Sequence, residues 1–188
     1  MITWKLPETA EIGGQQYRIN ADFRDVLEII AQMQNTEEPE QEQMYIALAL
    51  FYDDFDPMPG EHWQAAAEYL CDFINLGECE QDSRPAPKRI DWEQDYQIIA
   101  AEVNKSAGFE VRSVPFLHWW TFIGYFHTVG DGQLATVCSI REKRRKGKKL
   151  EQWEQEYYQE NKAKIDLKAT YSAEEQAELE ELKKILGE

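Results

Sequence analysis

The chain has 188 residues, of which 43% are hydrophobic and 12% aromatic, and its formal net charge is -16 at pH 7. This apolar and aromatic content is too high for a disordered chain, and the length allows one domain with a real core. The negative charge disfavours nucleic acids and anionic membranes as partners.

The charge is unevenly distributed along the chain. Residues 1–83 contain 18 acidic and 3 basic side chains, whereas residues 84–188 contain 18 acidic and 17 basic ones. A field of this kind would steer basic partners toward the first half. The simpler explanation, that the acidic side chains solvate helix faces, stays open beside it.

The cysteine content and the hydropathy of the sequence indicate the cellular compartment of the protein. The three cysteines are an odd number without a CxxC motif, which disfavours a disulfide framework and a zinc site. No secretory leader opens the sequence, and the apolar stretch 114–129 is shorter than the ~20 residues of a membrane helix. We therefore expect a soluble intracellular protein without a membrane segment, metal or cofactor.

A β-hairpin is predicted near the N-terminus. Residues 9–12 and 15–19 flank a Gly13-Gly14 pair, which suits a two-residue turn with positive φ. An isolated hairpin is marginal in water, so it should pack on helices, with residues 4–6 as a candidate third strand. In the expected register Ala10 pairs with Tyr17 and Ile12 with Gln15, which places Ala10, Ile12, Tyr17 and Ile19 on one apolar face.

Helical spacing of apolar residues dominates after the hairpin. Asp22 is a plausible N-cap for the first helix and Gly77 a terminator for the third. Pro and Gly residues favour a turn and an exposed loop between helices. The predicted helices cover residues 23–30, 44–51 and 63–74, the turn residues 53–60, and the loop residues 77–88.

Two further helices form the middle of the chain. Asp91 is expected to cap a helix over residues 92–107, with Gln94 at the capping-box position and Gly108 as terminator. The next helix, residues 116–127, is apolar around most of its circumference and is predicted to be central.

The C-terminal part is more polar. A short helix around residues 134–138 leads into a basic cluster, and a thin apolar stripe of Leu150, Trp153 and Tyr157 follows. A last helix is predicted after a Ser172/Glu175 capping box. The expected fold is mostly α, a helical bundle with a small N-terminal antiparallel β-hairpin. It comprises a domain over residues 1–145 and a charged helical extension over residues 146–188.

No short catalytic or metal-binding motif is present. GxGxxG, GxxxxGK[ST], GxSxG and HExxH are all absent, so the sequence favours a protein that is not an enzyme and has no catalytic residues. His118 and His127 are nine residues apart, which does not suit chelation on a helix, and both are predicted to be packing histidines.

Two sequence features are candidate partner-binding sites. Residues 141–149 contain seven Lys or Arg, which could bind phosphates, an acidic protein surface, or the acidic half of this chain or another copy, or could form an exposed helix junction. Adjacent tryptophans suit either an interface centre or a core. The candidate residues are Arg141, Arg144, Arg145, Lys148, Trp119 and Trp120.

Several stretches together resemble a known family. The first is the hairpin followed by Tyr17-x-Ile19-Asn20-x-Asp22-Phe23-Arg24. The second is Asp91-x-x-x-Asp95-x-x-x-Ile99-x-Ala101, and the third is Leu117-His118-Trp119-Trp120-x-Phe122. The fourth is the pair Ile140-Arg141. In order and spacing they resemble the phage gene-product-fifteen family of siphophage virion-assembly proteins, which is similar to the tail assembly chaperones. The resemblance covers most of residues 9–145.

The resemblance implies a specific function, which the helical spacing of the apolar residues does not indicate. It implies a non-enzymatic tail assembly chaperone in the cytoplasm of the bacterial host, which oligomerises and binds the tape measure protein and other phage tail proteins. The alternatives are a structural head-tail connector or completion protein, and a nucleic-acid-binding phage protein that uses residues 141–149.

Overall fold

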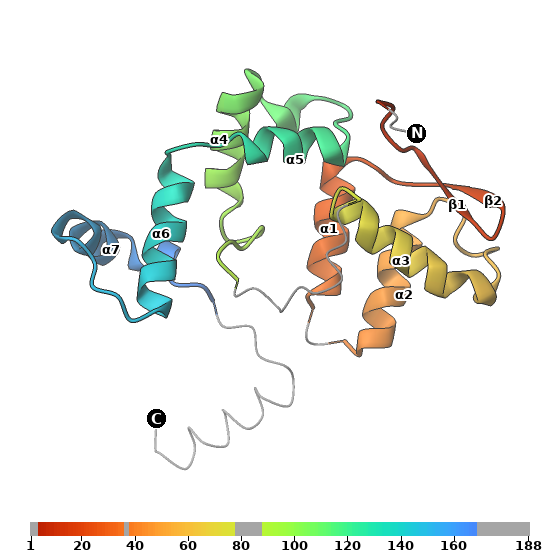
Figure 1. Ribbon diagram of the computed structural model, residues 1–188, viewed down its shortest axis with the longest axis horizontal. Helices are drawn as coiled ribbons and strands as arrows, with labels where there is room; N and C mark the ends of the chain where they lie inside the picture. The colour runs from red at the N-terminus through yellow and green to blue at the C-terminus, as the bar shows by residue number, and fades with distance from the viewer. Residues whose placement is uncertain (1–3, 36–37, 78–87, 169–188) are drawn as a thin grey trace, which may run out of the picture.

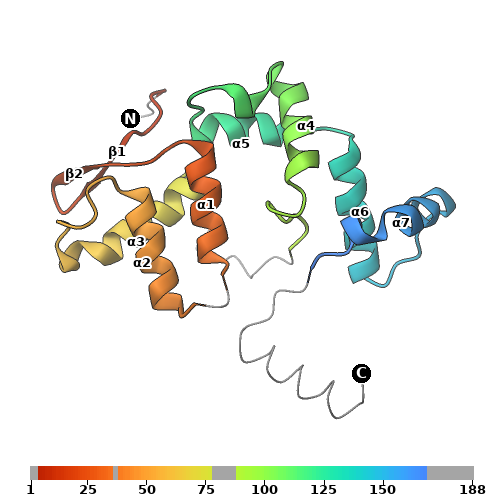
Figure 2. The same ribbon diagram turned by 180° about the vertical axis from the view of Figure 1, so that it is seen from behind.

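The structure is a computed structural model that describes residues 4–35, 38–77 and 88–168. These residues form seven α-helices, two short 3₁₀ helices and one two-stranded antiparallel sheet. The predicted fold class, mostly α with a small N-terminal hairpin, is confirmed. The helices form an arch (Figures 1 and 2). The hairpin and α1 to α3 form one side, α4 and α5 the top, and α6 and α7 the other side. The helix bounds are α1 Phe23–Met33, α2 Glu40–Phe51, α3 Trp63–Ile74, α4 Tyr96–Ala107, α5 Trp119–His127, α6 Gln133–Arg145 and α7 Gln152–Ile165.

The hairpin, β1 (Thr9–Ile12) and β2 (Gln15–Arg18), has the predicted register, with Ala10 opposite Tyr17. Its predicted apolar face is buried, and the Tyr17 hydroxyl lies 2.9 Å from His62 Nδ1, just before α3. The prediction of a third strand at residues 4–6 is wrong. These residues form no strand, and the Trp4 side chain is 97% exposed.

The starts of α1 and α5 are joined by a short extended pairing. Phe23 N donates to Leu117 O at 2.9 Å, and Trp119 N donates to Ala21 O at 2.8 Å. Asp22 caps α1 as predicted, and its second carboxylate oxygen accepts from Leu117 N at 2.9 Å. The helix predicted from residue 116 therefore begins only at Trp119, because residues 116–118 are extended in this pairing. The resulting α5 is central, since it contacts both α1 and α4.

Helix α4 begins four residues later than predicted. Asp91 does accept hydrogen bonds, from Glu93 N at 3.0 Å and Gln94 N at 2.7 Å, but it caps a separate turn before the helix. The N-cap of α4 is Asp95, whose carboxylate binds other groups. Gly108 ends the helix as predicted, with a φ of 79°.

The apolar core has two parts. The large part extends from the hairpin to Leu134 at the start of α6, and the small part lies between α6 and α7 around Ile140 and Tyr158. The predicted stripe of α7 is wrong at Trp153, which is 57% exposed, whereas Glu154 is buried. No helix within the described ranges could cross a membrane. Residues 78–87 of the predicted loop 77–88, and the predicted last helix, lie outside the described residues.

Candidate functional site

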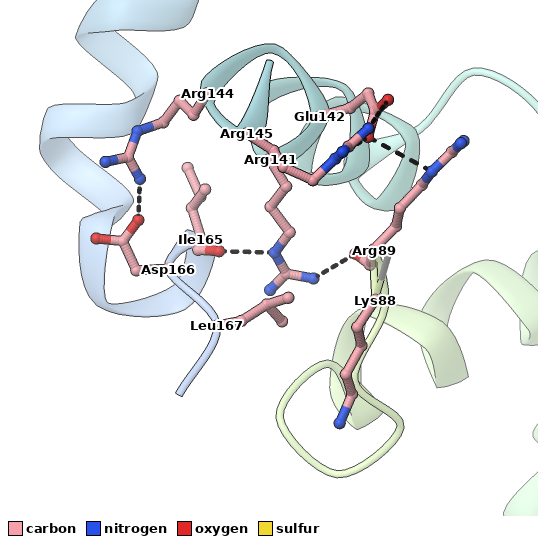
Figure 3. A pocket seen from close by; sticks show the side chains of 9 residues that line it. All are labelled: Lys88, Arg89, Arg141, Glu142, Arg144, Arg145, Ile165, Asp166 and Leu167. Atoms are coloured by element: carbon pink, nitrogen blue, oxygen red, sulfur yellow. Dashed lines mark hydrogen bonds and ion pairs between the residues drawn. The ribbon is translucent and has the colours of Figure 1, made fainter. Parts of the chain in front are cut away.

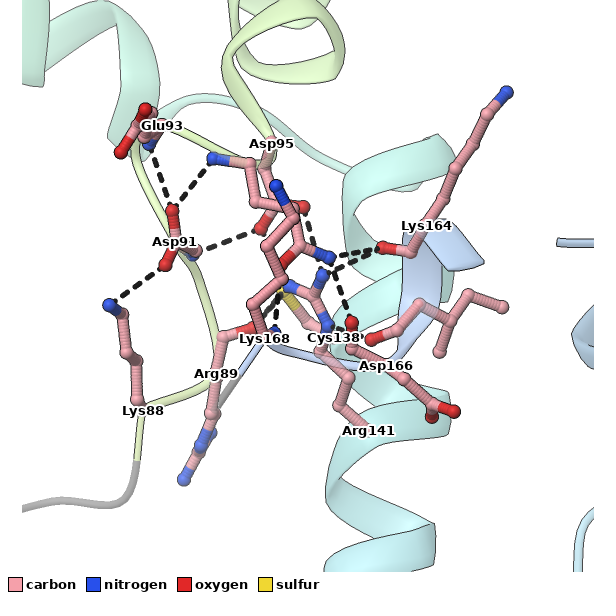
Figure 4. Close-up of polar contacts among 12 residues, drawn as sticks. Lys88, Arg89, Asp91, Glu93, Asp95, Cys138, Arg141, Lys164, Asp166 and Lys168 are labelled. Atoms are coloured by element: carbon pink, nitrogen blue, oxygen red, sulfur yellow. Dashed lines mark hydrogen bonds and ion pairs between the residues drawn. The ribbon is translucent and has the colours of Figure 1, made fainter. Parts of the chain in front are cut away.

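Arg141, in α6, is a buried cation at the centre of a polar cluster. Its guanidinium forms a bidentate ion pair with Asp95, with N–O distances of 2.6 and 2.9 Å. It also donates to the carbonyl oxygens of Arg89 at 2.9 Å, Lys164 at 3.0 Å and Ile165 at 2.6 Å (Figures 3 and 4). All five N–H donors of the side chain are thus used. We call these five residues the Arg141 cluster.

Gln94 extends this cluster toward the end of α7. Its Nε2 donates to the carbonyl oxygens of Lys164 at 3.0 Å and Asp166 at 2.9 Å, and its Oε1 accepts from Lys168 N at 3.1 Å. The backbone after α7 is therefore held against the turn that precedes α4. Gln94, which the sequence placed in a capping box, has this different role because the turn projects its side chain toward α7.

The other predicted cations of α6 bind carboxylates close by. Arg144 pairs with Asp166, and its guanidinium carbon lies 4.1 Å from the centre of the Tyr158 ring. Arg145 binds Glu142 at 2.8 Å. Within the described part of the chain Lys148 forms no ion pair.

Hydrogen bonds donated by these cations lower the pKa values of the carboxyl groups around them. Hydrogen bonds from Arg145 and Lys146 lower the pKa of Glu142 to about 2. The Lys143 ammonium, 2.7 Å from both carboxylate oxygens of Glu154, lowers the pKa of that buried group. Ionised carboxylates thus neutralise much of the basic cluster.

A hollow of about 380 Å³ lies beside the Arg141 cluster, lined by Lys88, Arg89, Arg144 and Arg145 among others (Figure 3). Lys88 binds Asp91 at 2.8 Å. Burial raises the pKa of Asp91, but hydrogen bonds from Lys88 and two backbone amides outweigh this and lower it. Within the described residues, the carboxylates that these cations bind all come from residues 84–188, so the structure shows no pairing with the described part of the acidic first half.

The structure places the two tryptophans against the end of α3. Trp119 is 2% exposed and donates its indole N–H to Ile74 O at 3.0 Å. Trp120, half-buried, donates to Phe73 O at 2.9 Å. These bonds satisfy two of the carbonyl groups that a helix C-terminus leaves free. Trp119 thus belongs to the core.

The two histidines have different environments. His118 is buried and caps α5, since its Nδ1 accepts from Trp120 N at 3.1 Å, which agrees with the predicted packing role. His127 is exposed at the end of α5, so the packing prediction is wrong for it. Across the described ranges, no three His, Cys, Asp or Glu side chains lie close enough together to hold a metal ion.

A groove that the sequence did not reveal lies between α1, the turn before α4, α4 and α5. It has a volume of about 360 Å³. We call it the apolar groove, because its wall is almost entirely apolar or aromatic. Its wall residues are Phe23, Leu27, Trp92, Tyr96, Ile99, Ala100, Val111 and Phe122, together with Arg24 and Arg112.

The two arginines of the apolar groove differ in how they are bonded. Arg112 is held by Glu110, at 2.7 and 2.8 Å, and these hydrogen bonds lower the pKa of Glu110 to about 2. Arg24 donates Nη2 to Val114 O at 2.6 Å, but its Nε is buried and has no acceptor within the described residues. Its Nη1 lies 3.4 Å from Asp22 Oδ1, and 38% of the side chain stays exposed at the groove.

The sequence did not reveal this groove because its residues were assigned to core stripes. Leu27 and Tyr96 have the helical spacing of buried residues, yet Tyr96 is 53% exposed. The apolar stripes of α1 and α4 continue from the core onto the groove wall, and periodicity alone cannot distinguish a core face from a groove wall.

The chain was compared with known proteins. No curated protein and no solved structure matches it. A family model described as Bacteriophage Gp15 protein matches residues 2–167. This match includes the hairpin, all seven helices and the stretches on which the resemblance was based. The chain therefore belongs to the Bacteriophage Gp15 protein family.

Proposed function

We propose that this phage protein is a non-enzymatic tail assembly chaperone, which binds the tape measure protein in the host cytoplasm and keeps it soluble until the tail tube assembles. Membership of the Bacteriophage Gp15 family supports a role in phage structure or morphogenesis. The observation that carries the proposal is the apolar groove. A groove of this kind suits an amphipathic helix, whose apolar face it would shield from water.

The cations of the apolar groove indicate the chemistry of the bound helix. Arg24 and Arg112 both line the groove, and their side chains are 38% and 52% exposed. An apolar stripe with a carboxylate beside it would complement both the apolar wall and the positive charge of these arginines. We therefore propose that the tape measure segment has acidic residues next to its apolar stripe.

Self-association is the second part of the proposal. Several large apolar side chains outside the apolar groove lining are exposed, among them Trp4 and Phe116. Exposed aromatic side chains are enriched at interface centres, which supports contacts between copies or with other tail proteins.

Co-expression with the tape measure gene of the same phage tests the function. We expect the long protein to become soluble and to co-elute with this chain in gel filtration. Tyr96→Asp, which puts a charge in the groove at an exposed position, should reduce the co-eluting fraction about tenfold. The matched control is Trp153→Asp, at a similarly exposed aromatic position on α7. This variant should change the co-eluting fraction little.

Two results would reject the function. One is a tape measure protein that is equally soluble without this chain. The other is the presence of this chain in purified virions by mass spectrometry, which would favour the alternative of a structural head-tail connector or completion protein.

A further inference from the structure

The described chain ends beside the apolar groove. Lys168 N donates to Gln94 Oε1 at 3.1 Å. Gln94 lies in sequence between Trp92 and Tyr96, which both line the groove. The remaining twenty residues therefore start next to the groove. Five extended residues span roughly 17 Å, so a segment that begins near residue 172 can reach the end of the groove formed by Trp92 and Tyr96.

The sequence of this last segment has the pattern that the apolar groove requires. Leu179, Leu182 and Leu186 have the i, i+3, i+7 spacing of one helical face. Glu175 precedes Leu179 by four residues and Leu182 by seven, which places a carboxylate in line with that apolar stripe. Residues 172–188 also contain six glutamates and two lysines, so the segment is acidic overall.

The groove and the segment are complementary in two independent respects. The groove wall is apolar over most of its surface, and the segment offers a narrow apolar stripe. Among the described lining residues the ionic side chains are Arg24 and Arg112, which are 38% and 52% exposed, and the segment offers carboxylates.

We propose that residues 172–188 dock as an amphipathic helix into the apolar groove of their own chain, with Glu175 close to the partly exposed guanidinium of Arg24. The same-chain occupant follows from where the described chain ends: the hydrogen bond between Lys168 and Gln94 fixes the start of the segment beside the groove. A short link gives a high effective concentration, which favours the chain's own segment over that of a second copy.

This docking does not depend on the identity of any partner protein. It adds a regulatory consequence if the proposed function holds, because a tape measure helix would then have to displace the segment from the apolar groove. Removing the segment's apolar stripe would in that case strengthen partner binding.

The test uses the full chain with a photocrosslinking amino acid, p-benzoylphenylalanine, in place of Leu182. After irradiation, mass spectrometry should identify links to α1 or α4 at the groove, in a product that has the mass of one chain. The matched control carries the same amino acid in place of Lys184, which lies on the opposite face of the predicted helix, and should give at least a tenfold lower yield at the groove. Tyr96→Asp, at an exposed wall position, should lower the Leu182 yield by a similar factor.

The outcomes separate the alternatives. Crosslinks from position 182 to the groove within single chains, with a yield that does not change on dilution, support the proposal. Groove links found only in crosslinked dimers would assign the groove to the segment of a second copy and overturn it. Links elsewhere, or equal yields from positions 182 and 184, would also overturn it. None of these results depends on tape measure binding, so the two proposals can fail separately.

Discussion

Arg141 and Asp95 form a bidentate ion pair in which both side chains are almost completely buried, with 6% and 1% of their surface exposed. The two residues are 46 positions apart and connect α6 to the start of α4. Charges taken out of water are costly unless every donor finds an acceptor, and the three carbonyl groups around the guanidinium meet this need. Arg141 therefore holds elements of the fold together and is not available on the surface.

Arg141→Ala should lower the free energy of unfolding by about 3–5 kcal/mol, because it leaves the Asp95 carboxylate buried without its partner. Urea unfolding followed by circular dichroism measures this loss. Lys148→Ala, at an exposed position of the same basic cluster, should change the stability by less than about 0.5 kcal/mol. Equal effects of the two substitutions would contradict the structural role of Arg141.

The basic cluster is expected not to bind DNA. Arg144 and Arg145 are paired with Asp166 and Glu142, so contact with phosphates would require these ion pairs to break. A gel-shift experiment at low salt should detect no complex, and Arg144→Glu with Arg145→Glu should not change that result. A shift of the wild-type protein that weakens with salt and is lost in the double variant would instead support the nucleic-acid alternative.

Gly13→Ala should destabilise the protein more than Gly14→Ala. Both glycines have positive φ, 59° and 79°, so alanine costs roughly 1 kcal/mol of backbone strain at either position. Only at Gly13 would the new methyl group also collide with the His62 ring, whereas the space at Gly14 is open. Thermal unfolding should therefore show the larger decrease in Tm for Gly13→Ala. Adding His62→Ala to the Gly13→Ala variant should restore part of the lost Tm. A double variant whose Tm does not rise would refute the collision.

Acid should weaken the α6–α7 contact through Glu154. Its pKa lies below the ordinary value of 4.5, so the ion pair with Lys143 contributes its full stability above about pH 4.5, and this contribution falls as the pH drops toward the folded-state pKa. Glu154→Gln should lower the free energy of unfolding by about 1 kcal/mol at pH 7, where it also weakens the cap of α7. It should also flatten the pH dependence of the stability below pH 4.5.

Denaturant unfolding at several pH values measures this effect. Glu160→Gln, an exposed position on the same helix, is the control and should leave the pH dependence unchanged. If Glu154→Gln and wild type lose stability in parallel between pH 4.5 and 3, the ion pair does not account for the acid sensitivity.

Local patterns in the sequence predicted the elements well where a single interaction determines them. The Gly13-Gly14 turn set the hairpin register, Asp22 set the start of α1, and Gly108 set the end of α4. The start of α5 was missed, because pairing between the extended residues 116–118 and the start of α1 is a contact between distant segments. Helix propensity carries no information about such a contact.

The candidate site was less predictable for a related reason. The seven cations of residues 141–149 have the same appearance in the sequence, but only Arg141 faces Asp95 and three carbonyl groups, while Lys148 is exposed. Burial of Glu154 also depends on a partner, Lys143, that lies on another helix. Which charge is buried is thus decided by the packing of α6 against α4 and α7.

The contacts of Arg141 also impose an order on folding during synthesis. Residues up to Leu134 supply the large core as they leave the ribosome, but Asp95 cannot be neutralised until Arg141 has followed. The carbonyl groups of Lys164 and Ile165 arrive later still. In a nascent chain that stalls before residue 164, Arg141 therefore lacks two of its carbonyl acceptors. Termination at that point would yield a protein in which α6 is held by fewer hydrogen bonds.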